Sequence, residues 1–296
     1  MNPSTSLKRT LVAAALLVGV GASVTASAYE WSDTALTYKY GTRFTEPYLT
    51  FNGPTQNIKK DYFVLSHANG YKYGNNLFVI DYIKSDNTDP VNAGTQGATE
   101  FYAIYRHNLS LSKVTGSKVG FGPVNDVGIV AGFNVSSKNT TFAPAVRKFV
   151  LGPRLSFDVK GGFWDLDFLY FKENNHCGTC TFPGQTLDVS FKGAYELATA
   201  WSVPFGESGF KFDGRAAYLG KKGNNGNNTP TSPETYFEGR LMYDIMGAIA
   251  NKKNTLYLGV GYQYWNNKFG NNATPPGIVA SGIKTNAPML VAEFHF

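Results

Sequence analysis

The chain has 296 residues and a formal net charge of +6, and charged residues make up only 16% of it, against about 25% in ordinary soluble domains. It contains 18 Tyr, 22 Phe and 32 Gly, and it has no Lys/Arg cluster that would indicate a nucleic-acid-binding protein. Beyond the N-terminal segment, no apolar run approaches the ~20 residues that a membrane helix needs. This composition favours a membrane β-barrel, in which alternation along strands replaces continuous hydrophobicity.

Residues 1–28 have the pattern of a secretory signal peptide. Two basic residues at positions 8 and 9 precede an apolar run over 11–24, and the small-residue sequence Ala-Ser-Ala at 26–28 is a cleavage pattern. A transmembrane anchor is the weaker alternative, because the run falls short of the ~20 residues that a span needs. We expect cleavage before Tyr29 and export across the inner membrane, with residues 29–296 forming one barrel domain.

Period-two alternation recurs along residues 29–296 and predicts twelve strands. The last strand shows it most clearly, since Leu290 and Phe294 alternate with Val291, Glu293 and His295. The predicted ranges are 35–50, 60–68, 73–84, 98–112, 124–137, 145–159, 162–173, 187–204, 209–221, 234–246, 254–268 and 286–296. An even number of such strands predicts an all-β fold, a closed antiparallel transmembrane barrel with both termini in the periplasm. Closure is required because lipid offers no hydrogen-bond partner to an open sheet edge.

The connections between these strands alternate in length. Long polar connections follow the first, third, seventh, ninth and eleventh strands, at 51–59, 87–97, 174–186, 222–233 and 270–285. Most of the others are short, such as 160–161 and 204–208. Long external loops and short periplasmic turns are typical of outer-membrane barrels. The connection at 113–123 departs from this scheme, which requires it to be short.

Alternation also assigns the two faces of each strand; in the range 187–204, for example, it places Phe191 on the lipid-facing side and Lys192 on the inward side. Aromatic residues near strand ends, Tyr62 among them, are expected in the interfacial girdles. The lumen-lining candidates are Asp81, Glu100, Tyr102, Arg106, Arg154, Asp158, Asp165, Asp167, Lys192, Glu196, Arg215, Glu238 and Arg240. These charges either pair and fill the interior or line a water-filled bore, and a twelve-strand barrel is wide enough to favour some open bore.

The mixture of charges on the inward face bears on what could pass through it. Selective filters for simple ions use rings of one sign, so charges of both signs are a poor match for that function. Ionisable groups beside aromatic rings suit a neutral solute that has a flat ring and hydroxyl groups. Nucleosides fit this description, and sugars fit it in part.

Cys177 and Cys180 form a Cys-Gly-Thr-Cys pair in a predicted external loop. A redox motif would need a helix N-terminus after the first cysteine, and a zinc site would need more ligands than His176 adds. A local loop disulfide in an oxidising compartment is the preferred interpretation. We expect no metal site and no cofactor.

The four histidines, at 67, 107, 176 and 295, form no catalytic pattern. The chain has neither a Gly-x-Ser-x-Gly element nor a His-Glu-x-x-His element. His107 falls on a predicted lipid-facing position. We therefore expect that the chain is not an enzyme.

Short pieces of sequence, in order along the chain, resemble the Tsx nucleoside-channel family, which includes the OmpK-type proteins. They are Tyr40-Gly-Thr-Arg-Phe-Thr-Glu-Pro47, Gly97-Ala-Thr-Glu-Phe101 followed by Arg106, Gly120-Phe-Gly-Pro123, Ser202-Val-Pro-Phe205 and Val291-Ala-Glu-Phe-His-Phe296. The resemblance implies a monomeric twelve-strand barrel that passes nucleosides and deoxynucleosides through a narrow channel. It places Phe44, with Arg43 beside it, in the nucleoside path. Some family members also bind phages or colicins through outer loops, and the loops here show no match that can be aligned.

The expected function is passive, selective diffusion of nucleosides and deoxynucleosides across a Gram-negative outer membrane. The alternatives are a general small-solute porin and a barrel that acts mainly as a phage or colicin receptor. Expected partners are nucleosides, outer-membrane lipid and lipopolysaccharide, and the barrel-assembly machinery, which would read the C-terminal Phe296. A phage is a further candidate partner, and no nucleic acid is expected.

Overall fold

The computed structural model describes residues 29–49, 57–90, 97–140, 143–178, 180, 183–272 and 280–296. The predicted signal peptide lies outside these residues, as do parts of the predicted long loops. No helix among the described residues is both long enough and apolar enough to cross a membrane. The strands are β1 (Trp31–Phe44), β2 (Tyr48–Leu49), β3 (Ile58–Tyr71), β4 (Gly74–Ser85), β5 (Thr99–Ser110), β6 (Val124–Lys138), β7 (Arg147–Phe157), β8 (Phe163–His176), β9 (Asp188–Ser190), β10 (Ala194–Pro204), β11 (Phe210–Leu219), β12 (Glu234–Asp244), β13 (Leu256–Asn266), β14 (Ala280–Ser281) and β15 (Thr285–His295); the helices are α2 (Leu111–Thr115), α3 (Ile245–Ala250) and the 3-10 turn η1 (Lys268–Gly270).

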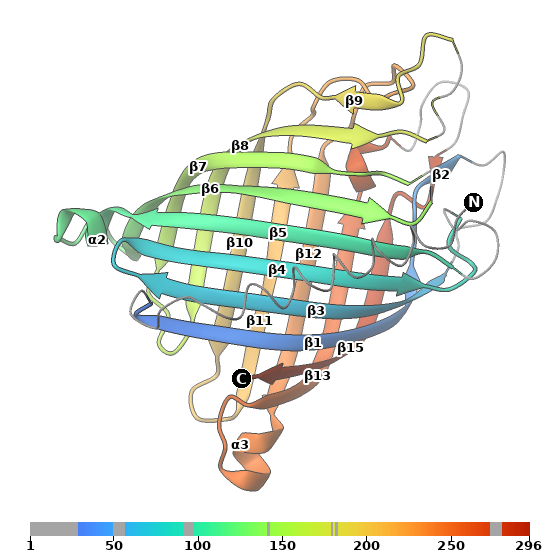
Figure 1. Ribbon diagram of the computed structural model, residues 1–296. Helices are drawn as coiled ribbons and strands as arrows, with labels where there is room; N and C mark the ends of the chain where they lie inside the picture. The colour runs from blue at the N-terminus through green and yellow to red at the C-terminus, as the bar shows by residue number, and fades with distance from the viewer. Residues whose placement is uncertain are drawn as a thin grey trace, which may run out of the picture.

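Twelve of these strands form a closed antiparallel barrel, which confirms the predicted fold class (Figure 1). The ring runs β1, β3, β4, β5, β6, β7, β8, β10, β11, β12, β13, β15, and each strand pairs with its two neighbours. The last strand closes the ring on the first, from Ala35 opposite His295 to Gly41 opposite Met289. The described barrel therefore has no free strand edge along this seam.

The two ends of the barrel differ. At the end that we call the terminal end, Phe296 donates its backbone N–H to the carbonyl of Thr34 at 3.0 Å, so the start of β1 and the end of the chain lie together. Helices α2 and α3 project from this end (Figure 1). The opposite end, the loop end, carries β2, β9, β14 and η1 in its connections. The side of the membrane that each end faces stays a prediction.

Helix α2 accounts for the long connection at 113–123. The Ser110 hydroxyl accepts a hydrogen bond from the backbone N–H of Lys113 at 3.1 Å and caps the helix N-terminus. Gly116 ends the helix at φ 69°, a left-handed conformation that glycine adopts without strain. The terminal end thus carries one compact helical turn at a place where the alternation of loop lengths predicted a short turn.

The barrel wall has apolar side chains outside and charged side chains inside. Phe63 and Phe149 keep 54% and 51% of their surface exposed on the outer face. Lys39, Glu238 and Glu293 face the interior and are buried. A continuous apolar exterior exceeds what a monomeric soluble protein leaves in water, and it is the pattern of a barrel surrounded by lipid.

Candidate functional site

The inward face holds most of the predicted lumen residues. Buried or half-buried there are Asp81, Glu100, Tyr102, Arg106, Arg154, Asp165, Asp167, Glu196, Arg215, Glu238 and Arg240. They come from β4, β5, β7, β8, β10, β11 and β12. Period-two alternation brings them to one face because successive side chains of a strand point to opposite sides.

Two predicted lumen residues are not on that face. Strand β7 ends at Phe157, so Asp158 lies in the following turn, where it is exposed. Lys192 is also exposed, because residues 191–193 belong to neither β9 nor β10 and the alternation is interrupted there. Phe191, predicted to face lipid, is instead buried, with the Lys222 ammonium 4.6 Å from its ring centre.

The structure separates the two residues that the family resemblance placed together. The register between β1 and β3 shifts between Gly41 and Phe44, which marks an irregularity of the β-bulge type. As a result Arg43 is exposed on the outer face, while Phe44 turns inward and is only 1% exposed. The Phe44 ring packs 5.4 Å from the ring of Tyr62. A solute could stack on Phe44 only if this packing opened.

Tyr62 lies in the interior, so its predicted place in an interfacial girdle is wrong. It is 6% exposed, and the Lys39 ammonium lies 4.8 Å from the centre of its ring. Sequence alternation could not decide this strand, since residues 58–65 place charged and apolar side chains on both faces.

One ion pair crosses the interior from wall to wall. Strands β4 and β11 lie six positions apart whichever way the ring is followed, so they face each other across the barrel. Arg215 on β11 nevertheless approaches Asp81 on β4 to 3.7 Å. The Arg215 side chain is 35% exposed although it points inward, so side chains do not fill the interior completely at this level.

A hydrogen-bonded network extends from Arg215 along β12 to Lys39 on β1. Arg215 donates to the hydroxyl of Tyr236 at 3.3 Å, and that hydroxyl donates to Glu238 at 2.7 Å. Glu238 also binds the Lys39 ammonium at 2.8 Å. The guanidinium lies 5.3 Å from the Tyr236 ring centre, so an aromatic face and charges of both signs meet at mid-depth.

The facing wall carries a second polar group. The Lys148 ammonium binds Glu196 at 2.9 Å. Arg106 donates to the side-chain oxygen of Asn134 at 2.7 Å, and the amide of Asn134 donates to the hydroxyl of Tyr102 at 2.6 Å. Within the described residues, no carboxylate lies within ion-pair distance of Arg106. Its guanidinium therefore keeps donor capacity for a solute.

Toward the terminal end the interior charges form a denser network. Glu293 binds Lys211 and Arg240, both at 2.7 Å, and Arg240 binds Asp213 at 2.5 Å. On the opposite wall, Arg154 binds Asp165 at 2.9 Å and Asp167 at 2.7 Å. Each of these networks joins positive and negative groups, so neither presents a ring of one sign.

At the loop end, residues from the connections fold into the mouth. Glu46 accepts from Lys60 and, at 3.3 Å, from Lys268. Burial alone would raise the pKa of Glu46, but Lys268 and Lys60 hold it well below its ordinary range. Burial lowers the pKa of Lys268 to about 8, an effect that Glu46 offsets only in part. The Lys268 ammonium also lies 4.8 Å from the ring centre of Trp265.

A second lysine closes the other side of the mouth. Lys222 follows β11, is only 2% exposed, and binds Glu173 at 2.7 Å and Glu234 at 3.2 Å. Burial opposes the charge on Lys222, but the two carboxylates raise its pKa above the ordinary value. Sequence reasoning missed both lysines, since Lys222 fell in the predicted loop 222–233 and Lys268 at the end of the predicted strand 254–268, whereas it lies in η1 beyond β13.

Two apolar clusters line the interior between the charged networks. One includes Phe44, Tyr62 and Met289, on the arc from β12 through β15 and β1 to β4. The other includes Val150 and Phe171, on the arc from β6 to β11. The interior therefore offers apolar surface on two facing arcs, with ionised groups between them.

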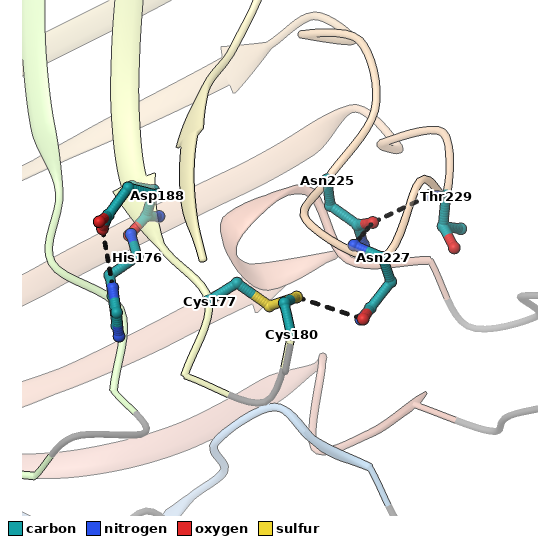
Figure 2. Close-up of a disulfide and its surroundings, with 8 residues drawn as sticks. His176, Cys177, Cys180, Asp188, Asn225, Asn227 and Thr229 are labelled. Atoms are coloured by element: carbon teal, nitrogen blue, oxygen red, sulfur yellow. Dashed lines mark hydrogen bonds and ion pairs between the residues drawn. A yellow bond between two sulfur atoms is a disulfide. The ribbon is translucent and has the colours of Figure 1, made fainter. Parts of the chain in front are cut away.

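Cys177 and Cys180 form a disulfide at the loop end (Figure 2). The bridge packs against the connection between β11 and β12, where Cys180 Sγ lies 3.2 Å from the side-chain oxygen of Asn227. Thr186 donates its backbone N–H to the carbonyl of Gly226 at 2.9 Å. The disulfide thus belongs to the contact between two loops, directly beyond the loop end of β8.

The histidines lie apart from one another. His67 and His107 bond to Thr34 at 2.8 Å and Asn76 at 2.9 Å, and His176 and His295 bond to Asp188 at 2.8 Å and Asp33 at 2.9 Å. In the part of the chain that the structure describes, no group of three or more His, Cys, Asp or Glu side chains could hold a metal ion.

No family model matches the sequence, and no curated protein matches it. Solved structures with a similar arrangement of strands include the KdgM porin, at a TM-score of 0.44 and 10% identity over 88% of this chain and 99% of that one. They also include the translocator domain of the autotransporter NalP from Neisseria meningitidis, at 0.42 and 10% identity over 99% and 98%. A third is Pseudomonas aeruginosa OccK11, at 0.38 and 11% identity over 90% and 95%. At this level of similarity the chain is assigned to no family.

Proposed function

We propose that the protein is an outer-membrane channel for the passive diffusion of small polar solutes, and that nucleosides are its preferred class. The observation that carries this proposal is the Arg215–Asp81 pair, which meets across the barrel at 3.7 Å while the Arg215 side chain keeps 35% of its surface exposed to unfilled interior space. A path that narrows to one cross-wall ion pair would admit small solutes and hold back large ones.

The chemistry of the interior supports a neutral solute. Interior cations are mostly neutralised by nearby carboxylates, so a permeating ion would meet groups of both signs and no uniform ring. Tyr236 and Tyr102 lie beside the two arginines, Arg215 and Arg106, on facing walls. A flat base could stack on an aromatic face, and ribose hydroxyls could bond to the guanidinium and carboxylate groups.

The outer face supports placement in a membrane. Exposed aromatic and aliphatic side chains surround the ring, while the interior holds the charges. The family resemblance of the short sequence pieces supports the choice of nucleosides over sugars. The proposed orientation places the terminal end in the periplasm and the loop end outside.

The test is single-channel recording in planar bilayers. We expect adenosine and thymidine to reduce the current saturably, because a solute bound beside Arg106 and Arg215 would occupy the ion path. Arg106→Gln is expected to weaken the block by about one charged hydrogen bond, roughly 1.5–3 kcal/mol. Arg147→Gln is the matched control, because Arg147 is exposed on the outer face. An unchanged current with both nucleosides would refute the selective-channel proposal.

A specific observation favours a second candidate, a barrel with a closed interior that acts as a receptor. Lys222 and Lys268 fold into the loop-end mouth and are 2% exposed, which narrows the entrance. This candidate predicts no conductance in bilayers. Deletion of residues 223–231 would then abolish phage adsorption without removing any transport activity.

A further inference from the structure

We propose that the outer surface of β15, β1, β3 and β4 at the loop end binds a lipid whose headgroup carries two or more phosphates. Four cations define this surface, which we call the basic rim: Lys284, Arg43, Lys59 and Lys84. Each cation lies in, or directly before, one of the four strands β15, β1, β3 and β4, which are consecutive in the ring. Lys284 directly precedes β15, and each of the others lies one residue inside the loop end of its strand.

The four side chains point away from the interior. Arg43, Lys59 and Lys284 are exposed, and Lys84 is half-buried. Their strand neighbours at the same level, such as Lys60 and Thr285, are buried in the interior. Because adjacent strands lie about 4.8 Å apart, the basic rim covers roughly 15 Å of the circumference.

The four cations of the basic rim form no ion pair with any residue that the structure describes. Interior cations such as Lys39 and Lys60 each bind a carboxylate. Among the residues that the structure describes, no carboxylate lies within ion-pair distance of any of the four rim cations. Asp61 lies opposite Lys84 in the register, but it accepts a hydrogen bond from the Tyr38 hydroxyl at 2.5 Å. Asp86 donates its backbone N–H to the carbonyl of Lys59 at 3.0 Å, and its carboxylate accepts from Thr88. Four positive groups therefore face two carboxylates, each of which is hydrogen-bonded elsewhere.

Aromatic side chains lie directly below the basic rim. Strands β1, β3 and β4 each carry one exposed aromatic residue there, namely Tyr38, Phe63 and Tyr82. Each lies two to five residues farther from the loop end than the cation of its own strand. The Lys284 ammonium lies 5.5 Å from the ring centre of Tyr264. In membrane proteins, cations lie just beyond a belt of aromatic rings at the boundary between the hydrocarbon core and the lipid headgroups. The basic rim therefore lies at headgroup level.

The number and spacing of the cations identify the headgroup. A lipid with one phosphate can neutralise one cation. Four cations without an ion-pair partner, against two carboxylates, leave an excess of positive charge on adjacent strands that matches a headgroup with several negative charges. The loop end is the end with the long connections, which faces outward in bacterial barrels. The occupant is therefore a multiply phosphorylated glycolipid of the outer leaflet.

The test measures binding of purified bisphosphorylated lipid A to the whole protein in an uncharged detergent, by native mass spectrometry. The variant Lys59→Gln/Lys84→Gln/Lys284→Gln is expected to bind on the order of a hundredfold more weakly, since each cation near a phosphate surface contributes about one kcal/mol. The matched control is Lys118→Gln/Lys160→Gln/Lys252→Gln, which removes the same charge from exposed residues at the terminal end. The control is expected to bind as the unsubstituted protein does.

Three outcomes would overturn the proposal. They are no binding of lipid A to the unsubstituted protein, an equal loss of affinity in the control variant, and equally tight binding of phosphatidylglycerol, which carries a single phosphate. The proposal depends on placement in the outer membrane, but it does not depend on transport. Nucleoside block in bilayers tests transport separately, so the failure of one leaves the other standing.

Discussion

The contact between Asp81 and Arg215 shows how single residues set the width of the path. The two strands that carry them face each other across the ring, yet the side chains meet at 3.7 Å. On the other side the guanidinium donates to the Tyr236 hydroxyl, which in turn donates to Glu238. Removing the Asp81 charge would therefore break the ion pair across the interior, while Arg215 stays hydrogen-bonded to Tyr236 on the neighbouring strand.

Asp81→Asn is expected to raise conductance and to shift selectivity toward anions, because Arg215 loses the carboxylate that neutralises it. The measurement is the reversal potential in a salt gradient across a planar bilayer. Asp158→Asn removes the same charge from an exposed turn and serves as the control. A shift of equal size in the control would mean that Asp81 does not act within the path.

Lys268 makes the loop-end mouth sensitive to pH. The pKa of Lys268 is lowered to about 8, so the ammonium is charged below that pH and neutral above it. Glu46, whose pKa is well below its ordinary range, stays ionised throughout. Between pH 7 and pH 9 the mouth should become more negative and cation selectivity should rise. Lys268→Met should abolish this dependence, and a dependence that persists would assign it to another group.

At the scale of elements, the two loops at the disulfide depend on a close approach at Gly226. A Cβ added there would lie 2.3 Å from the Thr186 carbonyl oxygen and 2.6 Å from Cys180 Sγ. Glycine is the residue that lets the two backbones come this close. Figure 2 shows the disulfide facing the turn that contains Asn225 and Asn227.

Gly226→Ala is expected to separate the two loops and leave the barrel intact. Limited proteolysis should cut the connection between β8 and β10 faster, while the thermal midpoint of the barrel stays unchanged. Gly220→Ala is the control, because Gly220 lies with Gly226 in the connection between β11 and β12 and its Cβ would meet the Tyr195 carbonyl oxygen at an ordinary 3.4 Å. Equal proteolysis of the two variants would contradict the role of Gly226.

At the scale of the whole molecule, the apolar exterior requires hydrocarbon around it. Leu151 lies near the middle of β7 and is 46% exposed, and Val114 in α2 is 47% exposed. The two side chains are equally accessible, and only Leu151 lies in the apolar band. The change in folding stability when each is replaced by a charged residue therefore shows whether the side chain is surrounded by lipid or by water.

Leu151→Arg is expected to lower folding stability in lipid vesicles by about 2–4 kcal/mol, the cost of a cation at the bilayer midplane. Val114→Arg should change it by less than about 0.5 kcal/mol, as surface substitutions usually do. Urea titration of tryptophan fluorescence in vesicles measures both. Equal, small changes in folding stability would mean that Leu151 faces water, and they would contradict the placement of the barrel in a membrane.

Much of the fold could be predicted, because alternation was unambiguous along most strands. In β15, Leu290 and Phe294 are exposed while Val291 and Glu293 are buried, as the pattern predicted. In β3 both faces carry charged and apolar residues, so Tyr62 was misplaced. At residues 191–193 the strand is interrupted, which reversed the expected faces of Phe191 and Lys192.

The candidate site was predictable only as a set of inward-facing residues. Alternation found Asp81 and Arg215, but it could not show that they meet, since a pairing across the ring depends on strand order and register. Lys222 was missed because no local pattern distinguishes a loop residue that folds inward from one in solvent. Lys268 was missed because the predicted strand ran on to residue 268, while β13 ends at Asn266.

The sequence by itself determined the number of strands and which face of most strands turns inward, because both follow from the two-residue period of a strand. Tertiary structure alone decided which charges neutralise one another, how far the loops enter the mouth and which cations remain unpaired on the outer rim. These depend on distances between residues far apart in the chain, and those distances are set only when β15 pairs with β1 and the ring closes.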